Sequence, residues 1–235
     1  MTAQKSFQAK NAESTSSSES KGLYQYGGVY FYCGAIMGRK NIFVTDDILA
    51  LMANAFKMTE VKMDVKNLAY VIMPNFFYWL FRLSERQNNP VEIYKELKKD
   101  LTREILTNLV EEAKGKKPCA LAEVFRGNAR VGRSPAGKIL DVFEASAKQL
   151  NSKKHFQVWV PRTELRLIDN DELLRQKIKA IKAIPVSERW QLAKRAEDYP
   201  YFYLAEDVSA LSDDNAKISD FATVMTGQKV VSVNA

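Results

Sequence analysis

The sequence predicts an α+β protein: a ferredoxin-like antiparallel sheet with helices on one face, plus a basic helical insertion. The first observation is the order of the strand-like and helix-like patterns, which is strand, helix, strand, strand, helix, insertion, strand, helix. The second is composition, because 46% hydrophobic and 27% charged residues in a chain of 235 are typical of one or two globular domains. The third is the positive charge, which is concentrated in residues 113–154.

The first half of the chain alternates between strand-like and helix-like patterns. Its first segment is rich in Tyr, Val and Phe and predicts a long strand. A helix follows, with Thr45 or Asp46 as its cap and apolar residues at helical spacing. The pair Pro74-Asn75 marks a turn between two later apolar runs. The expected strands are 23–36, 61–65, 67–73 and 76–83, and the expected helices are 44–57 and 91–112.

The second half of the chain also contains residues that are typical of helix starts. Ser134-Pro135 suits the cap and first residue of one helix, and Asn170 or Asp171 suits the cap of another. Between them, residues 156–160 alternate as in a strand. These elements complete the predicted ferredoxin-like order.

The ends of the chain are polar and are expected to lie outside the domain. Residues 1–21 are rich in Ser, Gln and Glu, which predicts disorder. We expect a domain at 22–207, with the basic insertion at 113–154, and a polar tail at 208–235. No apolar stretch marks a secretory signal, and the longest apolar run is too short to cross a bilayer. A cytoplasmic protein without a membrane span is therefore expected.

Counting residues excludes several kinds of chemistry. His155 is the single histidine, so a site that needs two histidines cannot form within one chain. Cys33 and Cys119 are far apart and form no C-x-x-C motif, which argues against a structural zinc or iron–sulfur site. No cofactor is expected.

The basic segment is the clearest functional signal in the composition. Residues 113–154 contain ten Lys and Arg against three acids, which equals the net charge of the whole chain, +7. Such a segment attracts a phosphate backbone, and arginines mixed with glycine in RGNARVGR suit close approach to phosphates. The alternative is a solvated insertion that keeps the chain in solution. The candidate nucleic-acid-binding residues are Lys116, Lys117, Arg126, Arg130, Arg133 and Lys138.

The string GRSPAGKI at 132–139 nearly fits a phosphate-binding loop. Its last position is Ile139, which has no hydroxyl group for Mg²⁺, so an NTPase is disfavoured. A capped helix start, with Lys138 or Arg133 near a phosphate, fits the string better.

The most distinctive string is AYVIMPNFFYWLFRL at 69–83. It resembles the single-tyrosine HUH transposases, above all their REP-associated branch, which carries a strand–turn–strand reading a-Y-V-x-M-P-N-H-x-H-L-L. The resemblance covers roughly residues 27–112 and 155–204. Further matching pieces, in the family's order, are GRKNIFVTDD, NPVEIYKELKKDLTREI, FQVWVPRTELRLIDNDELL, KIKAIKAIPVSERW and EDYPYFY.

The resemblance implies a dimeric ferredoxin-like domain that binds single-stranded or hairpin DNA. It also implies a divalent metal held by two histidines and a helix-borne tyrosine that attacks a phosphodiester. This chain departs from the pattern at each of these positions, because Phe76 and Tyr78 replace the histidines and Ala180 replaces the tyrosine. The chain therefore resembles a catalytically degenerate, domesticated member.

These observations favour a protein that binds nucleic acid, DNA or RNA, without cleaving it. One alternative is a structural subunit of a larger protein assembly that reuses the fold. A second alternative is an active transposase with a rebuilt site. The rings of Phe76 and Tyr78 have three open interpretations: core filling, base stacking or a docking surface.

Overall fold

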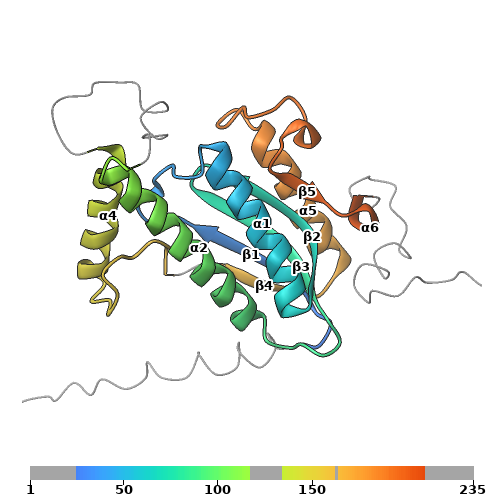
Figure 1. The fold of residues 1–235 in the computed structure, drawn as a ribbon. Coiled ribbons are helices and arrows are strands. Elements are labelled where there is room, and N and C mark those ends of the chain that lie inside the picture. Colours follow the sequence, from blue (N-terminus) through green and yellow to red (C-terminus); the bar gives the residue numbers. More distant parts are fainter. Residues whose placement is uncertain (1–24, 117–133, 162–163, 210–235) are drawn as a thin grey trace, which may run out of the picture.

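Five strands form one antiparallel sheet in the computed structural model, which describes residues 25–116, 134–161 and 164–209 (Figure 1). The sheet order is β4-β1-β3-β2-β5, and the first four strands have the arrangement of a ferredoxin-like βαββαβ unit. This confirms the predicted fold class. The strands are β1 (Val29–Ala35), β2 (Val65–Met73), β3 (Phe76–Leu83), β4 (Leu165–Ile168) and β5 (Phe202–Leu204). The helices are α1 (Asp46–Met63), α2 (Pro90–Ala113), α4 (Pro135–Gln149), α5 (Asp171–Val186) and the short α6 (Glu206–Ser209).

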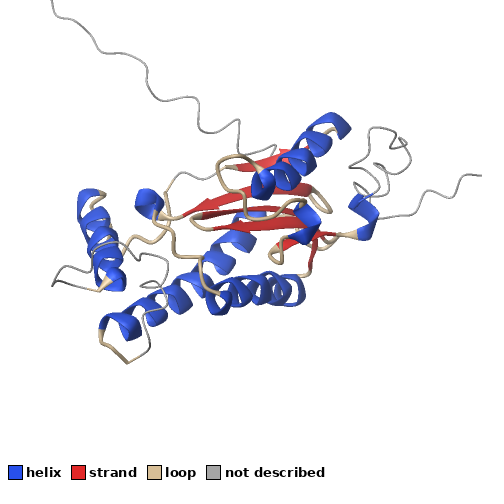
Figure 2. Cartoon of the chain, turned by 90° about the horizontal axis from the view of Figure 1, so that it is seen from above, coloured by secondary structure: helices blue, strands red, loops and turns tan. Residues whose placement is uncertain are grey.

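Helices cover both faces of the sheet, not one face as the sequence predicts. Helices α1 and α2 pack on one face, where Phe56 and Leu101 are buried. Helix α5 packs on the opposite face through Leu174 and Ile178 (Figure 2). The physical reason is that β2 is apolar on both sides, since eight of its nine residues are buried. Such a strand needs a cover on each face.

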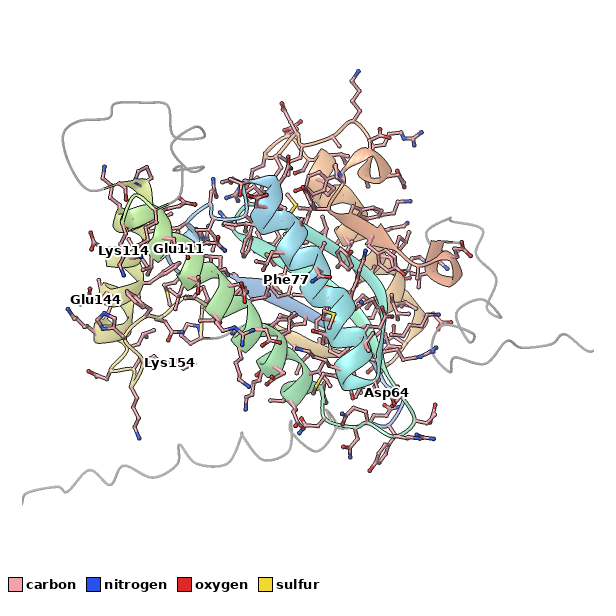
Figure 3. All side chains as sticks on the ribbon, viewed as in Figure 1. Asp64, Phe77, Glu111, Lys114, Glu144 and Lys154 are labelled. Atoms are coloured by element: carbon pink, nitrogen blue, oxygen red, sulfur yellow. The ribbon has the colours of Figure 1, made fainter. Side chains whose placement is uncertain are left out.

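Strand β3 lies between β1 and β2, and its side chains alternate between the two faces. Phe77, Trp79 and Phe81 belong to the core under α1 and α2. The Phe77 ring lies 5.3 Å from the Phe56 ring of α1, centroid to centroid (Figure 3). Gly34 of β1 makes this packing possible, because a Cβ there would lie 2.4 Å from the Phe77 ring.

Asn67 joins the sheet to α1 at a buried polar position. Its side chain accepts a hydrogen bond from Trp79 Nε1 at 2.7 Å and donates one to the Phe56 carbonyl at 3.1 Å. Its backbone N–H donates to Glu60 at 2.9 Å. Because Asn67 is 2% exposed, these bonds satisfy groups that water cannot reach.

The Pro74-Asn75 turn between β2 and β3 is fixed to the segment that follows β1. The Pro74 carbonyl accepts hydrogen bonds from Ile42 and Phe43, at 2.9 and 3.0 Å. Asn75 Nδ2 donates to the Arg39 carbonyl at 3.1 Å. The turn therefore holds the start of β3 in one place.

Two expected elements are wrong in detail. The predicted strand 61–65 is mostly helix, because α1 continues to Met63 and ends where Asp64 adopts a left-handed conformation. The predicted strand 156–160 forms only an isolated bridge between Trp159 and Ile36. The strand that completes the ferredoxin order is β4, five residues further on, where it pairs with β1.

The described part of the basic insertion is anchored to the domain. Ser134 caps α4 by accepting a hydrogen bond from the Gly137 N–H at 3.1 Å. One face of α4, with Ile139, Phe143 and Ala147, is buried, and the helix packs on α2. Among the described helices, none has the length and apolar character needed to cross a membrane.

The first prediction concerns the buried Asn67. Replacing Asn67 with Ala leaves the buried Trp79 Nε1 without its acceptor and removes a second hydrogen bond to the Phe56 carbonyl, so the free energy of unfolding should fall by about 3 kcal/mol. Urea denaturation measures this change. The control is Gln176→Ala on exposed α5 surface, which should change the free energy by less than about 0.5 kcal/mol. Equal effects of the two substitutions would contradict the assigned role.

Candidate functional site

A pocket of about 440 Å³ lies at the start of β3, on the face covered by α5. We call it the β3 pocket. It contains Phe76 and Tyr78, the positions where the family pattern has its histidines. The residues that line it are Cys33, Ala35, Arg39, Asn75, Phe76, Tyr78, Ile184, Ser187, Arg189 and Trp190.

The alternation of side chains along β3 turns Phe76 and Tyr78 toward this pocket. Both rings are half-buried and pack on the α5-side core. The ring of Phe76 lies 5.2 Å from that of Tyr78 and 6.0 Å from that of Trp190, centroid to centroid. Tyr78 also contacts Phe31 of β1, at 5.1 Å between ring centroids. The two rings therefore partly fill the core and partly line an open pocket.

The two groups in the β3 pocket that would attack as anions, a thiol and a phenol, are held in their neutral forms. Cys33 and Tyr78 face each other across the β1–β3 pair. Burial, with the nearby Glu164 carboxylate as a second cause, raises the pKa of the Cys33 thiol to about 11. Burial also raises the pKa of the Tyr78 phenol. A thiolate or phenolate nucleophile is therefore disfavoured here.

The residues of the β3 pocket do not fit a divalent metal of the kind that HUH transposases use. The described residues of its lining include no carboxylate and no imidazole, and a phenyl ring offers no lone pair to a metal. His155 lies elsewhere, exposed on the loop after α4 with its ring against Phe156. Within the described ranges, no three His, Cys, Asp or Glu side chains gather as a metal site would require.

Ala180 lies in the middle of α5, on the helix that covers the face of Phe76 and Tyr78. It is half-buried and stands one turn before Ile184, which lines the β3 pocket. Its methyl group can neither attack a phosphodiester nor donate a hydrogen bond.

Two arginines give the β3 pocket a positive character. Arg39 comes from the turn after β1, and Arg189 from the loop after α5. The Arg189 guanidinium stacks on the Trp190 ring, 5.2 Å from its centroid. Arginine and aromatic rings together can bind a phosphate and a base, although sequence reasoning did not select these residues.

Only part of the predicted basic cluster lies in the described ranges. Lys116 follows α2 and is exposed, and Lys138 is exposed in the first turn of α4. Both belong to the region where α2 and α4 pack together. Lys117, Arg126, Arg130 and Arg133 lie outside the described residues.

A second group of basic residues was missed by sequence reasoning. Lys95, Lys98 and Lys99 lie on α2, and with Lys154 they line another pocket. The sequence signal was their spacing of three and four residues, which places Lys95, Lys98 and Lys99 on one side of a helix.

Comparisons with known proteins find similarity among solved structures but none by sequence family. No protein-family model matches the chain, and no curated protein matches it. Among solved structures, the chain is similar to a REP-associated tyrosine transposase bound to a REP hairpin, with 16% identity over 79% of this chain and 82% of that chain. The TM-score is 0.48. That protein belongs to the branch that the motifs resemble, but at this identity and TM-score the membership of this chain stays a prediction.

The second prediction concerns Cys33. With a pKa of about 11 instead of 9.0, its thiolate fraction at pH 8 is about 100-fold lower than that of an ordinary thiol. In a Cys119→Ser background, iodoacetamide should therefore alkylate Cys33 at least about 100-fold more slowly in the folded protein than in urea. Mass spectrometry of timed samples measures both rates. Similar rates would show that the thiol is neither buried nor suppressed.

Proposed function

We propose that this protein binds nucleic acid through its basic surfaces and does not cleave it by the metal-and-tyrosine chemistry of HUH transposases. The observation that carries the proposal is the concentration of positive charge. Residues 113–154 hold ten Lys and Arg against three acids, and the rest of the chain is neutral in sum. A surface of this kind binds a phosphate backbone by displacing its counterions.

The described part of this segment supports a binding surface more than a solvated loop. Helix α4 buries an apolar stripe and packs on α2, so its lysines are carried by a fixed scaffold. One of its two acids, Glu144, is paired with Lys148 at 2.7 Å. In Figure 3, Lys114 and Lys154 lie on the side of the molecule where α2 and α4 meet.

The β3 pocket supports the second half of the proposal. Cleavage of the family type needs an ionised phenol and a polarised phosphate. The lining of this pocket supplies Phe76 and Tyr78 in place of histidines, and Ala180 stands where the tyrosine is expected. Arg39, Arg189 and Trp190 can still contact a phosphate or a base, so binding does not require the lost chemistry.

The third prediction is salt-dependent binding to hairpin DNA or RNA. In a mobility-shift titration, the affinity should fall about 100-fold or more between roughly 50 and 200 mM salt. Charge reversal of Arg126, Arg130 and Arg133 to Glu should abolish the shift.

A matched pair of variants tests the described lysines. The double variant Lys116→Glu with Lys138→Glu should bind at least about 10-fold more weakly and lose about 2 units of salt slope. The control double variant, Lys57→Glu with Lys194→Glu, has the same net charge and changes exposed lysines on other elements, and it should bind more tightly than the first. Equal affinities would contradict the proposal. Co-purification of a nuclease-resistant, stoichiometric protein partner, without any hairpin binding, would favour the structural-subunit alternative.

The fourth prediction is the absence of cleavage. A hairpin DNA incubated with the protein and Mn²⁺ should remain intact, and no covalent protein–DNA adduct should survive denaturing electrophoresis. A nicked product with an adduct on a tyrosine would show that the chain has rebuilt a catalytic site, against the proposal. Loss of that product in Tyr78→Phe would identify the group responsible.

A further inference from the structure

A second pocket, of about 570 Å³, lies between the first half of α2 and the segment 154–161. We call it the lysine pocket. Tyr94, Lys98 and Thr102 of α2 form one wall, and Lys154, Phe156 and Trp159 form the other. Its volume is in the range of sites that hold small organic molecules. It shares no lining residue with the β3 pocket, and of its lysines only Lys154 belongs to the basic segment 113–154.

The described lining of the lysine pocket carries an excess of positive charge. Among the described residues, four lysines line it and no carboxylate does. Lys99 pairs with Glu96 at 3.0 Å. For Lys98 and Lys154, no acidic partner lies within ion-pair distance in the described ranges. The two ammonium groups come from different elements and repel each other, which a dianion between them would relieve.

Lys98 is held in an unusual environment for a cation. Its Nζ lies 6.0 Å from the centroid of the Tyr94 ring and 5.6 Å from that of the Trp159 ring. Burial, with the charge of Lys154 as a second cause, lowers the pKa of Lys98 to about 8. An ammonium group that is partly desolvated and has no acidic partner is stabilised when an anion binds next to it.

The walls of the lysine pocket are fixed by internal contacts. Trp159 Nε1 donates a hydrogen bond to Thr102 Oγ1 at 2.8 Å, and this hydroxyl donates to the Lys98 carbonyl at 2.6 Å. The Tyr94 ring stacks on Tyr32 of β1, with 4.7 Å between centroids. These contacts hold the aromatic rings and Lys98 in place before any ligand arrives, which lowers the entropic cost of binding.

We propose that the lysine pocket binds the phosphate group of a nucleotide, with Lys98 and Lys154 as counter-charges and the base against Tyr94 and Phe156. A phosphate monoester carries a charge close to −2 at neutral pH, which matches two lysines. Both rings are half-buried and so keep surface for a planar base. The nucleotide is either free or the unpaired end of a bound strand, and in the second case the proposal rests on the proposed function.

The test titrates the full chain with adenosine 5′-monophosphate, followed by calorimetry, with adenosine as the ligand without phosphate. Wild type should bind the monophosphate and not adenosine. Lys98→Met and Lys154→Met should each weaken binding at least about 10-fold, since each removes one charged partner. The control Lys57→Met, on the exposed side of α1, should bind as wild type does. Absence of binding, or equal binding by Lys98→Met and Lys57→Met, would overturn the proposal.

Chemical modification of the wild-type protein tests the same proposal without relying on variants that could fail to fold. Acetic anhydride at pH 7.5 should modify Lys98, whose lowered pKa leaves part of its amine neutral, and the monophosphate should slow this modification several-fold while leaving that of Lys57 unchanged. Peptide mass spectrometry measures both sites. Modification of Lys98 at an unchanged rate with saturating monophosphate would overturn the proposal.

Repeating the hairpin mobility shift with Lys98→Met distinguishes the two sources of the nucleotide. Weaker binding of both hairpin and monophosphate indicates the end of a bound strand, and weaker binding of the monophosphate alone indicates a free nucleotide. Hairpin binding without monophosphate binding would overturn this inference and leave the proposed function intact. Monophosphate binding without hairpin binding would overturn the proposed function and leave this inference intact.

Discussion

The pairing of β3 between β1 and β2 is the constraint on which the rest of the structure depends. Because the strand is fixed on both edges, its side chains must alternate between the two faces. Phe77, Trp79 and Phe81 fill the core under α1 and α2. Phe76 and Tyr78 are therefore directed to the α5 face, at the mouth of a pocket. The strand pairing fixes the positions of Phe76 and Tyr78, and these two side chains determine which chemistry is available in that pocket.

The second general feature is the separation of packing from charge. The sheet and its helices use apolar and aromatic side chains, with few buried polar groups, such as Asn67, to fix the geometry. The net excess of positive charge lies in residues 113–154, where the described helix α4 packs on α2. Two pockets, on opposite faces of the sheet, are lined by cations and rings, and no carboxylate stands among the lining residues that the structure describes. This arrangement favours an anionic, planar partner.

Much of the fold could be predicted from the sequence, because local signals there were strong. The Pro74-Asn75 turn, the Ser134 cap and the Asn170 cap lie where the patterns indicate. The length of α1 was missed, because Val61 is a residue type that is common in strands. In the structure Val61 is 80% exposed on α1, since the helix propensities around it are not low enough to end the helix. The short β4 was missed because its pairing with β1 decides its structure more than its own residues do. Phe76 and Tyr78 could be singled out from the sequence by its resemblance to a family with histidines there, whereas the lysine pocket arises from two segments about 60 residues apart and required the structure.

The central claim is that nucleic acid lies on the basic side formed by α2 and α4 and is held there without being cut. Photo-crosslinking with a hairpin that contains 4-thiothymine, followed by peptide mass spectrometry, tests this most directly. The account predicts crosslinks in peptides from residues 91–116 and 134–161, with the recovered DNA strand at its full length. Crosslinks confined to the exposed side of α1, or a strand shortened at a fixed position, would contradict it.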